Sequence, residues 1–218
     1  MHVVLINGPA GAGKTVYADG LTKRLKEILS HKIYEKKHGV ASVLRAGFKD
    51  PGRHMLYAFA ASVSLIPLTY DPFDDALYEW LKDQTIAGVK GRHWMISWLE
   101  AMRKEQGDVL ERLFLIKSQR INPDVVISDS MGFPAELEFF KRAARDPDSG
   151  VLGVTSLYLD GSLWNHKYEI YRDGQQFPND SRICLINQVK YVNVNIHDLA
   201  ETIADSIQMH AAQSTLPL

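Results

Sequence analysis

Residues 2–15 read HVVLINGPAGAGKT, a run of apolar residues that leads into a glycine-rich stretch. Residues 8–15 match the pattern G-x-x-x-x-G-K-[ST] in full. Glycines in this pattern let backbone N–H groups turn toward phosphate oxygens, and the following helix directs the positive end of its dipole at them. An apolar strand before the stretch and an amphipathic helix after it are the context that separates such a loop from a chance match. The stretch therefore predicts a nucleotide-binding loop at the start of an α/β fold.

The loop predicts a site for ATP and Mg²⁺. Lys14 is expected to reach the β- and γ-phosphates, and the hydroxyl of Thr15 is expected to be a ligand of Mg²⁺. The expected ATP-binding residues are those of the loop and of the first helical turn: Gly8, Ala10, Gly11, Ala12, Gly13, Lys14, Thr15 and Val16.

The rest of the chain alternates between strand-like and helix-like patterns. The expected strands are residues 2–7, 41–46, 124–129, 151–159 and 190–195. The expected helices follow the loop and cover about 50–65, 73–87, 92–120, 134–145 and the region around 199–207. The helix after the loop is expected to bury one stripe formed by Val16, Leu21, Leu25 and Ile28. This alternation predicts right-handed crossovers and a five-stranded parallel sheet with helices on both faces.

We expect a single domain over residues 1–218 with two special segments. Residues 50–123 are too long for one crossover helix, so they are predicted to form a helical, substrate-binding insert. Residues 160–189 lack a strong period and contain turn-forming residues, so they are predicted to be a lid-like segment at the carboxyl edge of the sheet.

Asp129 ends the expected strand at 124–129, which is a Walker-B-like position for a carboxylate that supports Mg²⁺. The alternative is a strand-terminal aspartate that only forms a turn. Residues 129–132 also spell the D-x-x-G of a GTPase switch, but the chain has no N-K-x-D sequence to read guanine, and NQVK at 187–190 has the wrong spacing. The GTPase interpretation is therefore the weaker one.

Composition limits the partners that we expect. The chain is 45% apolar and 23% charged, as in an ordinary soluble globular protein. The net charge of -1 argues against nucleic-acid binding through a general basic surface. No apolar run approaches the roughly 20 residues that cross a membrane, and no leader precedes the first strand, so we expect a cytoplasmic protein that contacts no membrane. A homodimer and a monomer both stay open.

Several segments, together and in order, resemble the bacteriophage-type deoxynucleoside monophosphate kinases, which are P-loop enzymes with the nucleoside monophosphate kinase fold. Phe48-Lys49-Asp50-Pro51-Gly52-Arg53 is similar to a family motif like F-A-D-P-L-K, and Arg92 begins a helix as a family arginine does. Residues 126–136, with VISD and Glu136, are similar to V-I-S-D-x-R-F-x-N-E. Asp180 and Ile186-Asn187 resemble a late family aspartate and an I-x-N motif. The chain departs from the family at Met131, where the family has arginine.

The resemblance implies a P-loop kinase that transfers a phosphoryl group from ATP, with Mg²⁺, to a deoxynucleoside monophosphate. It implies a phage enzyme that acts in the host cytoplasm on two small-molecule partners, the nucleotide donor and the monophosphate acceptor. Lys14 and Asp129 would be catalytic, with Thr15 and Asp129 holding the metal. The expected substrate-binding residues are Asp50, Arg53, Arg92 and Glu136. From the lid-like segment, Arg172 or Arg182 would close over the transferred phosphoryl group.

Alternatives stay open at this point. Each arginine could be a solvated surface charge, Asp50 could be the N-cap of its helix, and Glu136 could complement a helix dipole. The aromatic residues of the insert favour a hydrophobic core over a base-stacking platform; they are Phe73, Tyr78, Trp80, Trp94 and Trp98. Two further functions remain: a kinase acting on another acceptor, such as phosphomevalonate, a modified nucleotide or a nucleic-acid end, and a nucleotide-binding ATPase or GTPase module that transfers nothing.

Overall fold

The computed structural model describes residues 1–8, 12–32, 42–71, 74–130, 134–160, 183–190 and 196–213. The chain divides into two compact units: the sheet unit, Met1–Gly47 with Phe114–Leu218, and the helical unit, Phe48–Leu113. Of the segment predicted to be a helical insert, residues 50–113 lie in the helical unit and residues 114–123 lie in the sheet unit.

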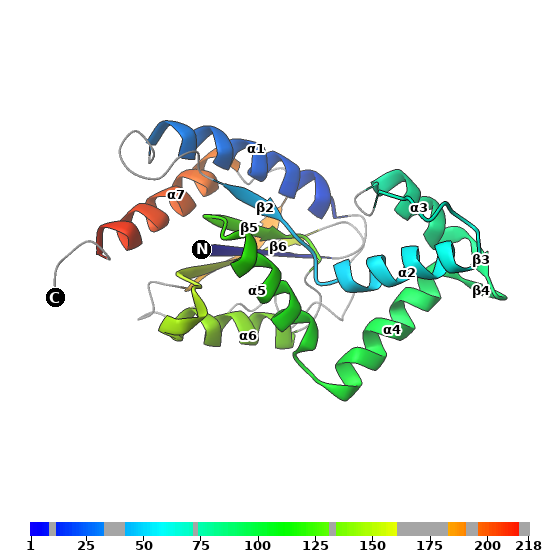
Figure 1. Cartoon of the computed structure of the whole chain (residues 1–218). Helices are drawn as coiled ribbons and strands as arrows, with labels where there is room; N and C mark the ends of the chain where they lie inside the picture. The colour runs from blue at the N-terminus through cyan, green and yellow to red at the C-terminus, as the bar shows by residue number, and fades with distance from the viewer. Residues whose placement is uncertain are drawn as a thin grey trace. The chain divides into compact units, whose positions relative to one another are not determined.

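A parallel sheet forms the centre of the sheet unit (Figure 1). Its strands in the described residues are β1 (His2–Asn7), β2 (Val43–Arg45), β5 (Val125–Ser128), β6 (Gly153–Asp160) and β7 (Ile183–Lys190), in the order β2-β5-β1-β6-β7. Every paired neighbour runs parallel; Val4 of β1, for example, aligns with Ile127 of β5 and Thr155 of β6. The prediction of an α/β fold with a parallel sheet flanked by helices is confirmed.

The last strand that the structure describes lies earlier in the chain than the range predicted for it, 190–195. The strand is Ile183–Lys190, aligned with β6 from the pair Val154–Ile183, and it shares only Lys190 with the expected range. Residues 183–186 are the apolar run ICLI, a pattern typical of a buried strand, but the polar pair Asn187-Gln188 follows it and hides the signal. Residues 183–189 are thus part of the sheet, while residues 161–182, which make up most of the expected lid-like segment, and residues 191–195 lie outside the described residues.

Helices cover both faces of this sheet. Helices α1 (Lys14–Lys32) and α7 (Ile196–Gln213) lie side by side on one face, and α5 (Val109–Ile121) and α6 (Pro134–Arg145) cover the other (Figure 1). A short 3-10 turn, Pro147–Ser149, leads from α6 toward β6.

The stripe predicted for α1 is correct except at its first position. Leu21, Leu25 and Ile28 are buried in the core between α1, α7 and the sheet, but Val16 is 60% exposed. Tyr17 takes its place, because positions 17, 21, 25 and 28 follow one another at helical spacing on a single face.

The helical unit contains α2 (Asp50–Ser62), α3 (Asp75–Asp83), a hairpin of β3 (Thr85–Ile86) and β4 (Val89–Lys90), and α4 (Gly91–Glu105). The hairpin was not predicted; its turn has positive φ at both Ala87 and Gly88, as a type I′ turn requires, without the usual Asn-Gly signal. The helix expected over residues 92–120 is two helices, α4 and α5, because the backbone becomes extended at Gln106, directly before Gly107. In the part of the chain that the structure describes, none of the helices is long and apolar enough to cross a membrane.

Candidate functional site

The glycine-rich loop has the strand and the helix that its sequence predicts. β1 ends at Asn7 and α1 begins at Lys14. Gly8 has φ +148°, and a Cβ atom there would lie 2.6 Å from the carbonyl oxygen of Leu159, so the position requires glycine. The side-chain oxygen of Asn7 accepts a hydrogen bond from the Gly8 N–H at 2.8 Å and fixes the exit from the strand. Pro9, Ala10 and Gly11 lie outside the described residues.

The side chain of Lys14 reaches back to the residue after β1. Its Nζ donates a hydrogen bond to the carbonyl oxygen of Gly8 at 2.8 Å, so the ammonium lies beside the end of this strand. The first turn of α1 has no acidic residue, and the positive end of the helix dipole is therefore left for an anion. Thr15 and Val16, in the same turn, are both exposed.

The position of the loop in the sheet also favours a ligand. β1 and β6 are neighbours in the sheet. The strand that follows β1 in the chain is β2, at one edge of the sheet, and the strand that follows β6 is β7, at the opposite edge. In open α/β sheets, ligands bind outside the carboxyl ends of the strands at such a switch point. The loop after β1 begins at this point.

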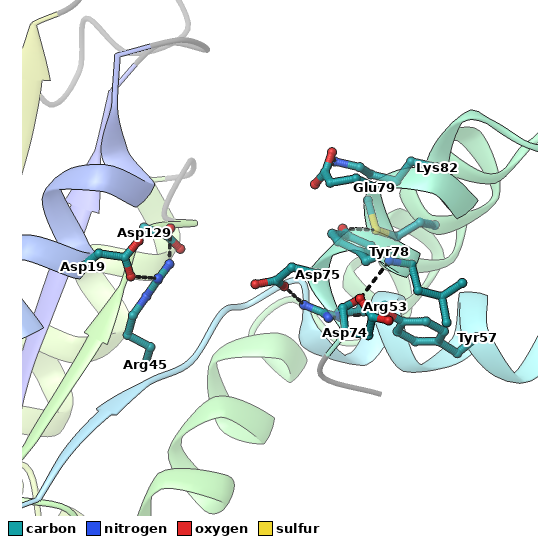
Figure 2. Close-up of polar contacts among 12 residues, drawn as sticks. Asp19, Arg45, Arg53, Tyr57, Asp74, Asp75, Tyr78, Glu79, Lys82 and Asp129 are labelled. Carbon is teal, nitrogen blue, oxygen red and sulfur yellow. Dashed lines mark hydrogen bonds and ion pairs between the residues drawn. The ribbon is translucent and has the colours of Figure 1, made fainter. Parts of the chain in front are cut away.

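Asp129 lies at the same edge and is held by an arginine that the sequence analysis missed. Arg45 ends β2, which pairs with β5, and its Nη2 donates to Asp129 Oδ2 at 2.7 Å (Figure 2). The Nη1 of Arg45 also donates to Asp19 Oδ1 on α1. Asp19 lies about one helical turn beyond Thr15. Arg45 therefore ties the Walker-B-like carboxylate to the helix that begins with Lys14 and Thr15.

The signal for this bridge was present in the sequence. Arg45 and Asp129 each stand at the carboxyl end of an expected parallel strand. Neighbouring parallel strands bring such ends together at one edge of the sheet. The order of the strands, however, was needed to show that β2 and β5 are neighbours.

The chemistry of Thr15 and Asp129 suits a magnesium ion that arrives with a nucleotide. Both supply hard oxygen ligands, and Asp129 is 19% exposed. Mg²⁺ keeps several waters and takes one or two protein ligands together with substrate phosphates. Within the described residues, His, Cys, Asp and Glu side chains nowhere gather in threes as a metal cage, which a Mg²⁺ of this kind does not need.

The helical unit contains a second arginine in a defined setting. Arg53 of α2 donates from Nη1 to Asp75 Oδ1 at 2.7 Å and from Nη2 to the hydroxyl of Tyr57 at 3.3 Å (Figure 2). Its guanidinium carbon lies 4.7 Å from the ring centroid of Tyr78. The Arg53 side chain is only 16% exposed. Two aromatic side chains thus hold a positive charge in place at one end of this unit.

Burial and charge shift the pKa values of these groups. Burial alone would lower the pKa of Arg53, but the hydrogen bonds that its guanidinium donates to Asp75 and Tyr57, together with the electrostatic attraction of these groups, outweigh burial, so the pKa is raised. Burial raises the pKa of Tyr57 and raises the pKa of Tyr78 to about 12. At neutral pH, the guanidinium is therefore charged and both phenols are neutral.

Three of the expected acceptor residues share the surroundings of Tyr78. Asp50 and Arg92, in addition to Arg53, act electrostatically on its phenol. Arg92 is the second residue of α4, whose start is fixed by Gly91: a Cβ atom there would lie 2.1 Å from the carbonyl oxygen of Leu81. Asp50, Arg53 and Arg92 thus belong to the helical unit, and the charge of each acts on the phenol of Tyr78.

Asp50 and Glu136 each lie in the first turn of a helix, α2 and α6 respectively. The N-cap of α2 is Lys49, so Asp50 is no cap but the first helical residue, where its charge complements the dipole. Glu136 lies in the first turn of α6, in the sheet unit, and is 1% exposed. Met131, Arg172, Asp180 and Arg182 lie outside the described residues.

The aromatic residues of the insert are mainly core. Trp94 and Trp98 stack with centroids 5.6 Å apart, and with Tyr78 they pack against the buried cluster of the helical unit. Trp80 differs, since 44% of it is exposed. Phe73 lies outside the described residues.

No protein-family model matches the chain, and no curated protein matches it significantly. The function of the chain is therefore inferred from its residues and from the place of each residue within its own unit.

Proposed function

We propose that the protein is a P-loop kinase that transfers a phosphoryl group from ATP, with Mg²⁺, to a small molecule that already bears a phosphate. The observation that supports it most is the edge of the sheet unit, where Lys14 donates to the carbonyl oxygen of Gly8 and Arg45 ties Asp129 to α1. These groups match the needs of a bound nucleoside triphosphate: backbone N–H groups, an ammonium and a carboxylate.

In this proposal the sheet unit binds the donor. Lys14 exchanges its hydrogen bond to the Gly8 carbonyl for the β- and γ-phosphates of ATP. Thr15 and Asp129 hold the Mg²⁺, which neutralises charge on the phosphates. The nearby Val16, exposed on α1, contacts the nucleotide.

The helical unit binds the acceptor. Arg53 and Arg92 hold its phosphate, because the guanidinium fork matches phosphate oxygens and the charges of both residues act on the phenol of Tyr78. Asp50, in the same surroundings, orients the acceptor. A module that only hydrolyses ATP has no need of such an arginine pair, and this favours transfer over simple hydrolysis.

The resemblance to the bacteriophage-type kinases supports a deoxynucleoside monophosphate as the acceptor and the nucleoside monophosphate kinase fold for the whole chain. Arg172 or Arg182 would complete the site over the transferred phosphoryl group. Phosphomevalonate, a modified nucleotide or a nucleic-acid end is the acceptor of the alternative proposal.

A coupled assay of ADP release tests the proposal. ATP and Mg²⁺ are supplied with each of the deoxynucleoside monophosphates, with phosphomevalonate, or with no acceptor. We expect turnover that depends on one or a few deoxynucleoside monophosphates. Turnover that is the same without any acceptor would overturn the kinase, while turnover with phosphomevalonate alone would establish the alternative acceptor.

A matched pair of variants assigns the activity to the proposed groups. Arg53→Gln removes the acceptor guanidinium, and Arg112→Gln removes an exposed arginine of the same unit that pairs only locally with Asp108. We expect Arg53→Gln to raise the KM of the acceptor by roughly tenfold or more, with the KM of ATP unchanged. Arg112→Gln should leave both values unchanged.

A further inference from the structure

The guanidinium of Arg53 forms an ion pair with a carboxylate of its own chain, that of Asp75. Asp75 Oδ1 accepts a hydrogen bond from Arg53 Nη1 at 2.7 Å. The two partners differ in exposure, with 16% of the arginine side chain and 87% of the aspartate side chain accessible. In this pair the aspartate therefore lies almost entirely in solvent, and it can move away at little cost in packing.

Arg53 has supports that do not depend on Asp75. Its guanidinium lies over the ring of Tyr78 and donates to the hydroxyl of Tyr57. That hydroxyl is itself fixed, because it donates to the carbonyl oxygen of Asp74 at 2.6 Å, and the Tyr57 ring stacks on Tyr70 with centroids 5.1 Å apart. The guanidinium consequently keeps its place when the carboxylate leaves.

We propose that Asp75 is an internal competitor at the acceptor site: its carboxylate occupies on Arg53 the position of a phosphate oxygen and leaves when a phosphate monoester binds. The phosphate dianion has the stronger attraction for the guanidinium, because it has twice the charge and more acceptor oxygens. The inference rests on the proposed function in one respect, that the phosphate bound at Arg53 belongs to the acceptor of the reaction. The competition itself concerns any phosphate group that binds Arg53.

The expected size of the effect follows from the exposure of the pair. Exposed ion pairs change an equilibrium by up to about fivefold. Removing the charge of Asp75 should therefore lower the dissociation constant of a phosphate ligand by about twofold to fivefold. The direction distinguishes a competitor from a residue that contacts the ligand favourably, since loss of a favourable contact raises the dissociation constant.

Asp75 also has a structural role to be separated from this one. It stands in the first turn of α3, directly after the N-cap Asp74, where a negative charge complements the helix dipole. Glu79, on the same helix, supplies the matched control: it pairs with Lys82 and forms no ion pair with Arg53. Glu79→Gln removes one negative charge from α3 just as Asp75→Asn does.

The experiment measures binding without catalysis. The full chain is titrated with inorganic phosphate and, separately, with dTMP and the other deoxynucleoside monophosphates, in the absence of ATP. Calorimetry gives the dissociation constants, and the NMR signal of the Arg53 Nε–H reports whether this arginine is the group that responds. The proteins are the natural chain, Asp75→Asn, Asp75→Ser, Glu79→Gln, Arg53→Gln and the double variant Asp75→Asn/Arg53→Gln.

We expect both Asp75 variants to bind phosphate about twofold to fivefold more tightly, with Glu79→Gln unchanged. In the Arg53→Gln background, Asp75→Asn should have no effect on the dissociation constant, because the guanidinium for which Asp75 and phosphate compete is then absent. Weaker or unaltered binding in the Asp75 variants, or absence of any phosphate response at Arg53, would overturn the inference. Failure of the kinase proposal would instead appear as ADP release that no acceptor stimulates, whatever the titrations show.

Discussion

Arg45 in the sheet unit and Arg53 in the helical unit each hold a carboxylate at 2.7 Å, but their surroundings differ. Arg45 is 34% exposed and its two ion-pair partners are the carboxylates of Asp19 and Asp129. Arg53 is 16% exposed, has one carboxylate partner, and lies against the rings of Tyr57 and Tyr78. One arginine is held by charges, and the other is held mainly by aromatic rings.

This difference indicates two different uses of an arginine. A guanidinium that bridges two carboxylates neutralises them, and its removal leaves their charges to repel each other or to attract a cation. A guanidinium fixed by rings is preorganised, so that it can exchange one anion for another without being reordered. The first arrangement suits the metal side of the proposed reaction, and the second suits the phosphate side.

The largest expected effect concerns the donor side. Lys14→Ala removes the ammonium that donates to the Gly8 carbonyl, and we expect phosphoryl transfer to fall by about a thousandfold, as for other groups that stabilise charge in a transition state. Stability should change little, because alanine has a high helix propensity at the first residue of α1. The measurements are kcat/KM and a urea denaturation curve. Retained activity would remove Lys14 from the proposed mechanism.

The next effect tests whether the two units have independent cores. Leu25 and Leu81 are both fully buried, the first in the core of the sheet unit and the second in that of the helical unit. Replacing either leucine by alanine should cost about 2–5 kcal/mol of unfolding free energy. Hydrogen exchange locates the loss: Leu25→Ala should lower protection in α1 and α7, and Leu81→Ala in α2 and α4. Equal losses throughout the chain for both variants would show that the units unfold together.

The sequence predicted the elements that local chemistry determines. The parallel sheet flanked by helices, the strand His2–Asn7 followed by the helix that begins at Lys14, and the helix from Pro134 to Arg145 all follow from short-range patterns. The last strand was misplaced because the polar pair Asn187-Gln188 interrupts its apolar signal. The division of the helix expected over 92–120 was missed because a single glycine, Gly107, is a weak signal for a break.

The candidate site was less predictable, because ion pairs between distant residues leave no local pattern. The pairs Arg45–Asp129 and Arg53–Asp75 join residues 84 and 22 positions apart. The first depends on the strand order, which sequence spacing does not give. The second depends on how α3 packs on α2. A helical period predicts which face of each helix is apolar, but it does not predict which helices pack together. The residues Asp50, Arg53 and Arg92 were named from the sequence, whereas Asp19, Arg45 and Asp75 were not.

An effect of intermediate size is expected for the pH dependence of stability, and it tests the burial of Tyr78, the ring that lies against Arg53. Because burial raises the pKa of Tyr78 to about 12, the folded chain favours the neutral phenol more than the unfolded chain does. Its stability contribution is complete below the ordinary tyrosine pKa of about 10 and is lost as the pH rises from there to about 12. At about pH 11 the loss should be roughly 1 kcal/mol. Tyr78→Phe removes this loss, and its hydroxyl donates only to the sulfur of Met95, so stability at neutral pH should change little.

Urea denaturation of both proteins between about pH 8 and 11 measures the difference. Burial also raises the pKa of Tyr17 and Tyr57, so both proteins should lose stability in this range. The natural chain should lose more. Parallel curves for the two proteins would contradict the burial of the Tyr78 phenol.

The smallest effect tests the use of Arg45. Arg45→Gln leaves the carboxylates of Asp19 and Asp129 without their shared positive charge, so binding of Mn²⁺, used as a paramagnetic substitute for Mg²⁺, should become about threefold to fivefold tighter in the absence of nucleotide. Arg24→Gln is the control, because it removes an exposed arginine from α1 that pairs with Glu27 and contacts neither aspartate. Asp129→Asn should cancel the gain. If Arg45→Gln bound Mn²⁺ more weakly, Arg45 would position Asp129 for the metal rather than neutralise its charge. The two arginines would then differ only in where they lie, and the proposed difference in their uses would be wrong.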